Sequence, residues 1–280
     1  MKIALTGGSG KLGKAIAKAA IKNGHQVVSI DRVLPEGDLE QKNIRFVQAD
    51  LCAYEQLEQA FEGCDALLHM AAIPSPFNDP DHVVHNNNVV GNYNALRVAV
   101  GHGIKRICLA SSVNAIGFAF SREAKFDYFP IDEDHSNYCE DAYSLSKWIS
   151  EQQADSFARR YEDVSIASMR FHYVAEERAD AAKIFTAENK SGMKQLWAYT
   201  RSDAAASACL LSLEADFKGH EAFYIVAPDT CVDVPSMELA GKFYPDVPIK
   251  GKLEGNSSFF SSKKAEQILG WRHAPGSETA

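Results

Sequence analysis

Tyr143 and Lys147 are the pair of residues whose types and spacing most directly suggest chemistry. They stand four residues apart in Tyr143-Ser-Leu-Ser-Lys147, so a helix would place them on one face. A free phenol has a pKa of about 10, and a nearby cation favours the phenolate and lowers that pKa. The pair could therefore act as a general acid and base near neutral pH. The same spacing also occurs on many helices without a catalytic role, so the surrounding motifs must decide.

The glycine loop at the start of the chain predicts a dinucleotide site. In Thr6-Gly-Gly-Ser-Gly-Lys-Leu-Gly13 the glycines permit a tight turn and close backbone approach to a pyrophosphate. A helix starting in this loop offers free N–H groups to the anion. The loop lies between a predicted strand and a predicted helix, which favours a dinucleotide site over a structural turn. The cofactor candidates here are Gly7, Ser9, Gly10, Lys11, Leu12 and Gly13.

Asp31 closes the second predicted strand and favours NAD over NADP. A carboxylate there accepts hydrogen bonds from the adenosine ribose hydroxyls and repels a 2′-phosphate. Arg32 and Lys11 could instead pair with such a phosphate, or be solvated loop cations. Asp50 and Leu51 end the third strand, where an adenine would lie. Asp50 could accept a hydrogen bond from the exocyclic amine or cap the following helix.

The elements that must position these residues alternate between apolar runs and helical patterns. Continuous apolar strands separated by helices predict an α/β fold with a doubly wound parallel Rossmann sheet, covered on both faces. Ligands of such sheets bind at the carboxyl ends of the strands, and a hydroxyl of Ser111 or Ser112 there could bond a substrate oxygen. The predicted strands are 2–6, 26–31, 44–50, 65–70, 106–110 and 165–171, and the main helices are 11–22, 81–100 and 140–161.

The second half of the chain has a looser pattern. Residues 1–171 are predicted to form the dinucleotide-binding domain, and residues 172–280 a small interleaved substrate-binding cap. Within that cap, Rossmann elements return as a helix over 203–214, a strand over 222–226 and a helix over 262–269.

Composition excludes several classes of protein. The 280 residues carry a net charge of −8, which argues against a general nucleic-acid binder. The sequence shows neither an apolar run of about 18 residues nor a signal peptide, so we expect no membrane partner. The six cysteines show neither CxxC pairs nor zinc spacing. We therefore expect no metal, reduced thiols and a cytoplasmic location.

Several motifs occur together in the order typical of one family. The chain resembles the extended short-chain dehydrogenases/reductases, the group of sugar epimerases and dehydratases, over nearly its whole length. The motifs are the TGGSGKLG loop, Asp31, His69-Met-Ala-Ala72, Asn88-Val-Val-Gly-Asn-Tyr-Asn94, Ser111-Ser112, Tyr143-x-x-x-Lys147 and Ser262-Lys-Lys-Ala with Leu269-Gly-Trp271.

The resemblance implies roles for individual residues. Tyr143 would be the general acid/base, and Lys147 would bind the nicotinamide ribose and lower the tyrosine pKa. Ser112 would polarise the reacting C–O group, with Ser111 the alternative. The residues implied to line the cofactor channel or to lie behind the active site are Met70, Ala71, Ala72 and Asn88. Asn88 could instead satisfy backbone groups only. The helices 81–100 and 140–161 would form a homodimer.

The residues around the site indicate an oxidoreductase. Dehydratases of the family carry Asp-Glu after the active-site hydroxyl, whereas this chain has Val113-Asn114, and Asn114 becomes a substrate candidate. The string from Ala110 to Phe118 resembles uronate dehydrogenases, which oxidise a free sugar acid. His172 could contact substrate or only pack, and Arg178 could bind a carboxylate or be an exposed helix residue.

We therefore predict NAD-dependent hydride transfer to or from a small polyhydroxylated substrate, a sugar or sugar acid. Two alternatives stay open. A nucleotide-sugar epimerase would retain its NAD through the cycle, and a cofactor-sensing regulator would bind the dinucleotide without catalysis. The length of 280 residues favours a free, compact substrate over a nucleotide-linked one.

Overall fold

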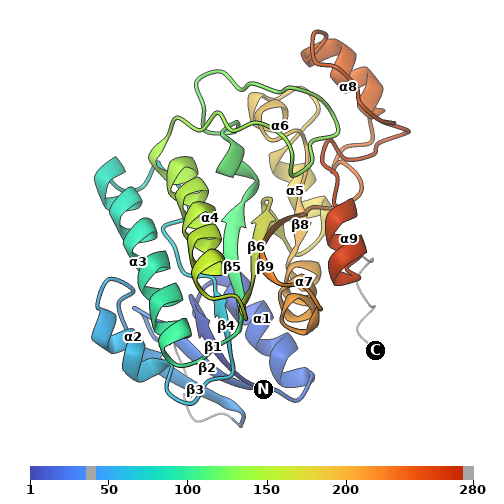
Figure 1. The fold of residues 1–280 in the computed structure, drawn as a ribbon. Helices are drawn as coiled ribbons and strands as arrows, with labels where there is room; N and C mark the ends of the chain where they lie inside the picture. The colour runs from blue at the N-terminus through green and yellow to red at the C-terminus, as the bar shows by residue number, and fades with distance from the viewer. Residues whose placement is uncertain (36–41, 274–280) are drawn as a thin grey trace.

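A seven-stranded parallel sheet lies at the centre of the computed structural model, which describes residues 1–35 and 42–273 (Figure 1). The chain builds outward from β1 to β3, then returns to the other side of β1 with β4 and continues outward. This reversal creates the switch point at which ligands of such sheets bind, and it confirms the predicted doubly wound α/β fold. Across the sheet the order is β3 (Ile44–Gln48), β2 (Gln26–Asp31), β1 (Lys2–Thr6), β4 (Ala66–His69), β5 (Arg106–Ser112), β6 (Ser165–Phe171) and β9 (Gly219–Ile225).

Helices cover both faces of the sheet (Figure 1). One face packs against α1 (Lys11–Lys22), α7 (Ser202–Glu214) and α9 (Lys263–Leu269) through a core that includes Ile16, Phe223 and Trp271. The other face packs against α2 (Tyr54–Ala60), α3 (Asp81–Gly101) and α4 (Ala142–Arg160). Because the inner strands β1, β4, β5 and β6 are buried on both faces, each of them reads largely as one apolar run.

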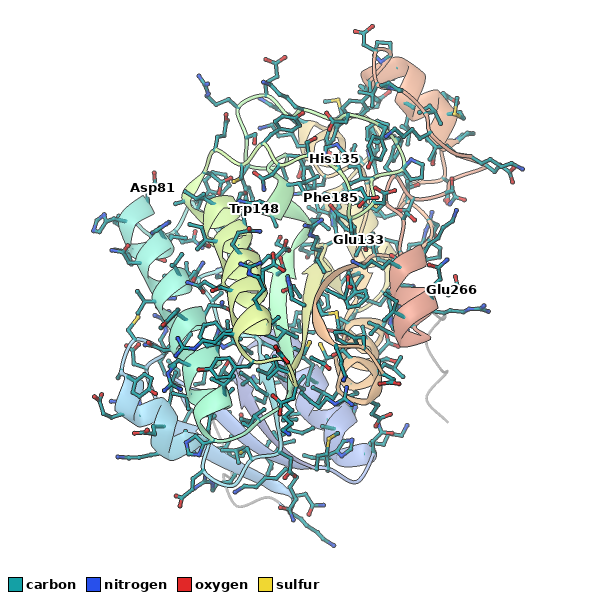
Figure 2. All side chains as sticks on the ribbon, in the orientation of Figure 1. Asp81, Glu133, His135, Trp148, Phe185 and Glu266 are labelled. Atoms are coloured by element: carbon teal, nitrogen blue, oxygen red, sulfur yellow. The ribbon has the colours of Figure 1, made fainter. Side chains whose placement is uncertain are left out.

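A second core lies beyond the carboxyl ends of the strands. It is built around Phe118, Phe129, Trp197 and Phe259, which come from both halves of the sequence. Figure 2 shows Phe185 and His135 on this side of the sheet. The short elements of this region are η1 (Val113–Ile116), β7 (Val174–Ala175), α5 (Arg178–Ile184), α6 (Lys190–Lys194), β8 (Thr200–Arg201) and α8 (Ser236–Phe243).

The observed elements differ from the predicted ones mainly at their ends. β5 continues to Ser112, two residues beyond the predicted end, because Ser111 and Ser112 pair with Arg170 and Phe171 of β6. The two-residue strands β7 and β8 were not predicted, since two residues carry no periodicity. A search of residues 1–35 and 42–273 finds no helix with the length and apolar character needed to cross a membrane. In the same residues, no group of three or more His, Cys, Asp or Glu side chains is placed to hold a metal ion.

Candidate active site

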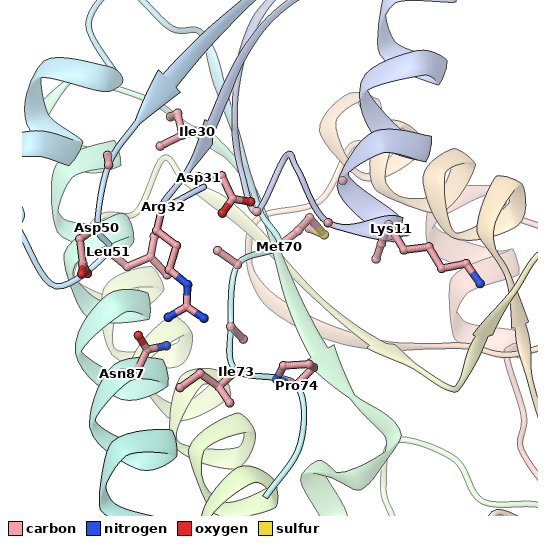
Figure 3. Close-up of a pocket in the computed structure, with 17 residues that line it drawn as sticks. Lys11, Ile30, Asp31, Arg32, Asp50, Leu51, Met70, Ile73, Pro74 and Asn87 are labelled. Carbon is pink, nitrogen blue, oxygen red and sulfur yellow. The ribbon is translucent and has the colours of Figure 1, made fainter. Parts of the chain in front are cut away.

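A cavity of about 390 Å³ opens at the carboxyl ends of the first strands (Figure 3). It lies between the glycine loop, the ends of β2 and β3, and the segment after β4. Most of the predicted cofactor residues line it together, although they come from four separate stretches of sequence. Those that line it are Gly7, Gly10, Lys11, Leu12, Gly13, Asp31, Arg32, Asp50, Leu51, Met70, Ala71 and Ala72.

The glycine loop has the shape required of an anion cradle. Gly7 has a φ of 72°, and a Cβ on it would lie 2.7 Å from the backbone nitrogen of Ala71. A Cβ on Gly13 would lie only 2.1 Å from the Gly7 carbonyl oxygen. Gly10 caps α1 without any side-chain hydrogen bond, which leaves the first N–H groups of the helix for a ligand. The loop therefore fits a dinucleotide pyrophosphate.

Asp31 is held at the cofactor pocket by backbone donors. Its carboxylate accepts hydrogen bonds from the N–H of Ser9 at 3.1 Å and from the N–H of Val33 at 3.3 Å. The Arg32 side chain points into the pocket in Figure 3, whereas the Lys11 side chain extends away from Asp31. The Lys11 ammonium donates instead to the Val174 carbonyl at 3.0 Å. Both residues line the pocket, but of these two possible partners of a 2′-phosphate only Arg32 directs its charged group into it.

Asn88 stands behind the pocket wall. Its carboxamide accepts from the Ile73 N–H at 2.8 Å and donates to the Ile73 carbonyl and to the Ser146 hydroxyl, each at 3.0 Å. The neighbouring residue Asn87 lines the pocket in its place. Asn88 thus lies behind the cavity, where the resemblance places it, and it fixes the segment after β4 against α4 through backbone groups of Ile73 and the side chain of Ser146.

A second cavity, of about 350 Å³, adjoins the first. The two cavities share Leu12, Met70, Ala72 and Pro74 in their walls. The second brings together the predicted catalytic and substrate residues from β5, η1, α4 and the end of β6. Those that line it are Ser111, Ser112, Asn114, Tyr143, Lys147 and His172.

Tyr143 and Lys147 lie together in this second cavity, both buried. The Lys147 ammonium is 5.8 Å from the centre of the Tyr143 ring and donates to the Ala110 carbonyl at 2.5 Å. Burial raises the pKa of Tyr143 to about 12, although a hydrogen bond with Ser112 lowers it. In the protein alone, the loss of solvation is therefore the main influence on the pKa of Tyr143, and the lowering by Lys147 that the resemblance implies stays a prediction.

Burial lowers the pKa of Lys147 to about 8, and the charge of Glu151 opposes this shift. Glu151 belongs to a buried network that we did not predict. It accepts a hydrogen bond from the Ser111 hydroxyl at 2.5 Å and two from the Arg170 guanidinium, at 3.0 and 2.8 Å. The Ser111 hydroxyl is therefore engaged with Glu151, which makes Ser112 the hydroxyl available to a substrate. The spacing of Lys147 and Glu151, four residues apart on one helix, could have revealed the network.

His172 is a buried residue of the second cavity's lining. Its Nδ1 accepts a hydrogen bond from the Tyr173 N–H at 2.7 Å, which assigns the proton of the neutral ring to Nε2. Nε2 has no hydrogen-bond partner among the described residues. Burial lowers the pKa of His172 to about 3, so the ring is neutral near pH 7.

Arg178 does not reach this cavity. Its guanidinium forms ion pairs with Asp229 at 3.0 Å and Asp233 at 2.6 Å and also donates to the Thr230 carbonyl. The hypothesis that Arg178 binds a substrate carboxylate is not supported by this placement. The charged residues around Arg178, Glu176 and Glu177, do not reveal that it pairs with Asp229 and Asp233. Both aspartates come from a loop more than 50 residues away.

Other lining residues of the second cavity were missed. Phe120 and Gln195 enter it from loops whose role the sequence left open, and Pro74 enters from the segment after β4. No local pattern marks them, since each contributes through the packing of its loop against the strand ends.

Residues 3–217 match the model of the "NAD dependent epimerase/dehydratase family". The chain belongs to this family. The match confirms the resemblance to extended short-chain dehydrogenases/reductases. It also confirms NAD as the predicted cofactor, because the family depends on NAD.

Individual proteins show the same relationship. The chain is 30% identical to uronate dehydrogenase of Pseudomonas syringae pv. tomato over 172 residues, which are 59% of this chain and 58% of that protein. It is also 30% identical to 2-alkyl-3-oxoalkanoate reductase of Stenotrophomonas maltophilia over 157 residues, 55% of this chain and 45% of that protein. The matched part is thus about half of these relatives' lengths.

The fold itself is shared over a greater length. The structure of UDP-glucose 4-epimerase from Bifidobacterium longum in complex with NAD+ and UDP aligns with a TM-score of 0.73. The alignment covers 99% of this chain and 94% of that one, at 18% identity. A likeness at this level of identity concerns the fold alone.

Proposed function

We propose that the protein is an NAD-dependent oxidoreductase that transfers a hydride between a small alcohol or ketone and the nicotinamide. One observation carries the proposal. The cavity that holds Ser112, Tyr143 and Lys147 shares a wall with the dinucleotide cavity, so a substrate oxygen beside the tyrosine would lie next to the cofactor. The 172–280 segment would supply the substrate cap, and residues 1–171 the dinucleotide site.

In the oxidising direction the substrate O–H proton passes to the Tyr143 phenolate, and the C–H bond breaks as the C=O bond forms. When bound in the adjoining cavity, NAD would supply the acceptor of this hydride. Ser112 donates a hydrogen bond to the substrate oxygen and orients it. The Lys147 ammonium and the positive charge of the oxidised nicotinamide both favour the phenolate, which must form against the raised pKa of Tyr143.

The predicted sugar or sugar acid remains the substrate class to be tested. A sugar acid would have to bind without Arg178, which is paired with Asp229 and Asp233. The nucleotide-sugar epimerase is the other candidate. We expect net NADH when the protein meets NAD and a free alcohol substrate from a panel of aldoses, uronic acids and simple secondary alcohols. Interconversion of UDP-sugars without net NADH would identify an epimerase instead. Tight NAD binding without turnover of any compound would indicate a regulator.

We also propose a homodimer formed through α3 and α4. Val90, Tyr93 and Leu145 expose 44%, 49% and 38% of their surfaces on these adjoining helices. Light scattering should give twice the mass of one chain, and Tyr93→Asp should lower it to one. A single-chain mass for the unaltered protein would contradict the proposal.

The six free thiols are in keeping with the predicted cytoplasmic location.

A further inference from the structure

Three aromatic rings form a continuous ladder beside the second cavity. The Phe120 ring meets the Tyr143 ring edge to face, with centroids 5.7 Å apart. Phe77 meets Phe120 in the same way, with centroids 5.3 Å apart. Phe120 lines the cavity together with Tyr143. The ladder therefore runs from the proposed catalytic phenol to the protein surface.

Phe77 is the outer end of this ladder and is 75% exposed. It lies in the segment that follows β4, three residues after Pro74, which lines both cavities. Covering such an exposed phenylalanine ring with a second apolar surface removes both surfaces from water, which lowers the free energy. Its edge contact with Phe120 holds it beside the substrate cavity, where a bound ring could supply that cover.

Among the described residues that line the same cavity, Lys147 carries the only positive charge that could pair with a substrate anion. The Lys147 ammonium is already bonded to the Ala110 carbonyl beneath the tyrosine. The lining also contains the uncharged polar side chains of Asn114, His172 and Gln195. A carboxylate or phosphate placed beside these groups would lose its hydration without a cationic side chain to pair with it.

We infer that the substrate is an uncharged secondary alcohol or ketone that carries an apolar ring. The ring lies against Phe120 and Phe77, while the reacting oxygen faces Ser112 and Tyr143. This inference rests on the proposed function, because it concerns the same site. It makes Phe77 and Phe120 the residues that determine specificity, and it excludes the sugar acids.

The test compares 1-phenylethanol with mandelate, in which a carboxylate replaces the methyl group, and with 2-butanol, which lacks the ring. Binding is measured by calorimetry on the NAD-loaded Tyr143→Phe variant, which keeps the ring ladder and in which we expect turnover to be strongly slowed. We expect 1-phenylethanol to bind at least tenfold more tightly than either relative. Equal or tighter binding of mandelate would overturn the inference.

Phe77→Ala in the same background should weaken 1-phenylethanol binding roughly 3- to 10-fold, the value of one aromatic contact. NAD affinity should stay within about twofold. Met237→Ala is the control, since it removes an exposed apolar side chain from α8. Unchanged 1-phenylethanol binding by Phe77→Ala would also overturn the inference. If the binding preferences hold but the unaltered protein forms no NADH, the proposed hydride transfer fails while the ligand class stands.

Discussion

The two adjoining cavities are built by different means. The cofactor cavity takes its shape from backbone, from glycines and from residues that directly follow β1, β2, β3 and β4. The substrate cavity takes side chains from loops as far apart in sequence as Pro74, Phe120 and Gln195. A site made by strand ends is defined by local motifs, whereas a site made by loop packing is defined by the tertiary structure.

The comparison also explains how the two cavities recognise ligands. The first presents helix N–H groups and a fixed carboxylate to polar parts of a dinucleotide. The second presents aromatic rings, uncharged polar groups and the Lys147 ammonium around one tyrosine. Substitutions that affect one cavity and spare the other test whether this division is real.

Tyr143→Phe should give the largest effect. It should impair the chemistry of the substrate cavity and leave NAD binding in the cofactor cavity unchanged. Loss of the general acid/base should lower kcat by about 10²- to 10⁴-fold. The NAD dissociation constant should change less than about twofold, because the ring remains in place. Steady-state kinetics and calorimetry measure the two quantities. Near-normal turnover in this variant would rule out the proposed mechanism.

Gly13→Ala should produce the converse result in the cofactor cavity. The new methyl group would lie 2.1 Å from the Gly7 carbonyl oxygen, so the loop must move. We expect NAD affinity to fall roughly 10- to 100-fold, in line with the usual energy of overpacking. Gly241→Ala is the matched control, because no atom lies within 4 Å of a Cβ at that position in α8. Unchanged NAD affinity in Gly13→Ala would show that the loop does not cradle the cofactor.

Glu151→Gln should change the pH dependence of NAD binding. The pKa of Lys147 is about 8, and Glu151 raises it. NAD should therefore bind more weakly as the pH rises through about 8, where the ammonium loses its proton. Removing the carboxylate lowers the pKa of Lys147 further, so the weakening should begin at lower pH.

Arg170→Gln is the control for that change. It breaks the same buried ion pair, at a similar cost of up to about 3–5 kcal/mol, but leaves the charge of Glu151 beside Lys147. In Arg170→Gln the pH at which NAD binding weakens should be the same as in the unaltered protein or higher. A shift of both variants in the same direction would mean that Glu151 acts only through stability. Melting temperatures show whether both remain folded.

Arg178→Met should have the smallest effect on either cavity. The side chain is 32% exposed and paired with Asp229 and Asp233, so its loss should cost roughly 1 kcal/mol of stability. Turnover of any substrate should change less than about twofold. A large rise in KM confined to carboxylate substrates would restore the uronate hypothesis.

Much of the fold was predictable because apolar residues follow one another in its buried strands but recur every three to four residues in its helices. The strands β1, β2 and β6 have the predicted bounds, and α1 starts and ends where its apolar spacing and Gly24 indicate. The end of β5 was not predictable, since it depends on pairing with β6. Ser111 illustrates the same limit in the site, because its partner Glu151 lies 40 residues away.

The sequence by itself determined the sheet, the glycine loop, Asp31 and the tyrosine–lysine pair. These features depend on local spacing and on the backbone geometry of a strand, a turn or one helix face. Only the tertiary structure decided which partner each polar side chain has and whether it is solvated. In the folded chain Arg178 is paired with two aspartates that are distant in sequence. Tyr143 is buried, which raises its pKa, and the Phe120 ring packs against it. Charge pairing and desolvation depend on distances in space, which the order of residues does not record.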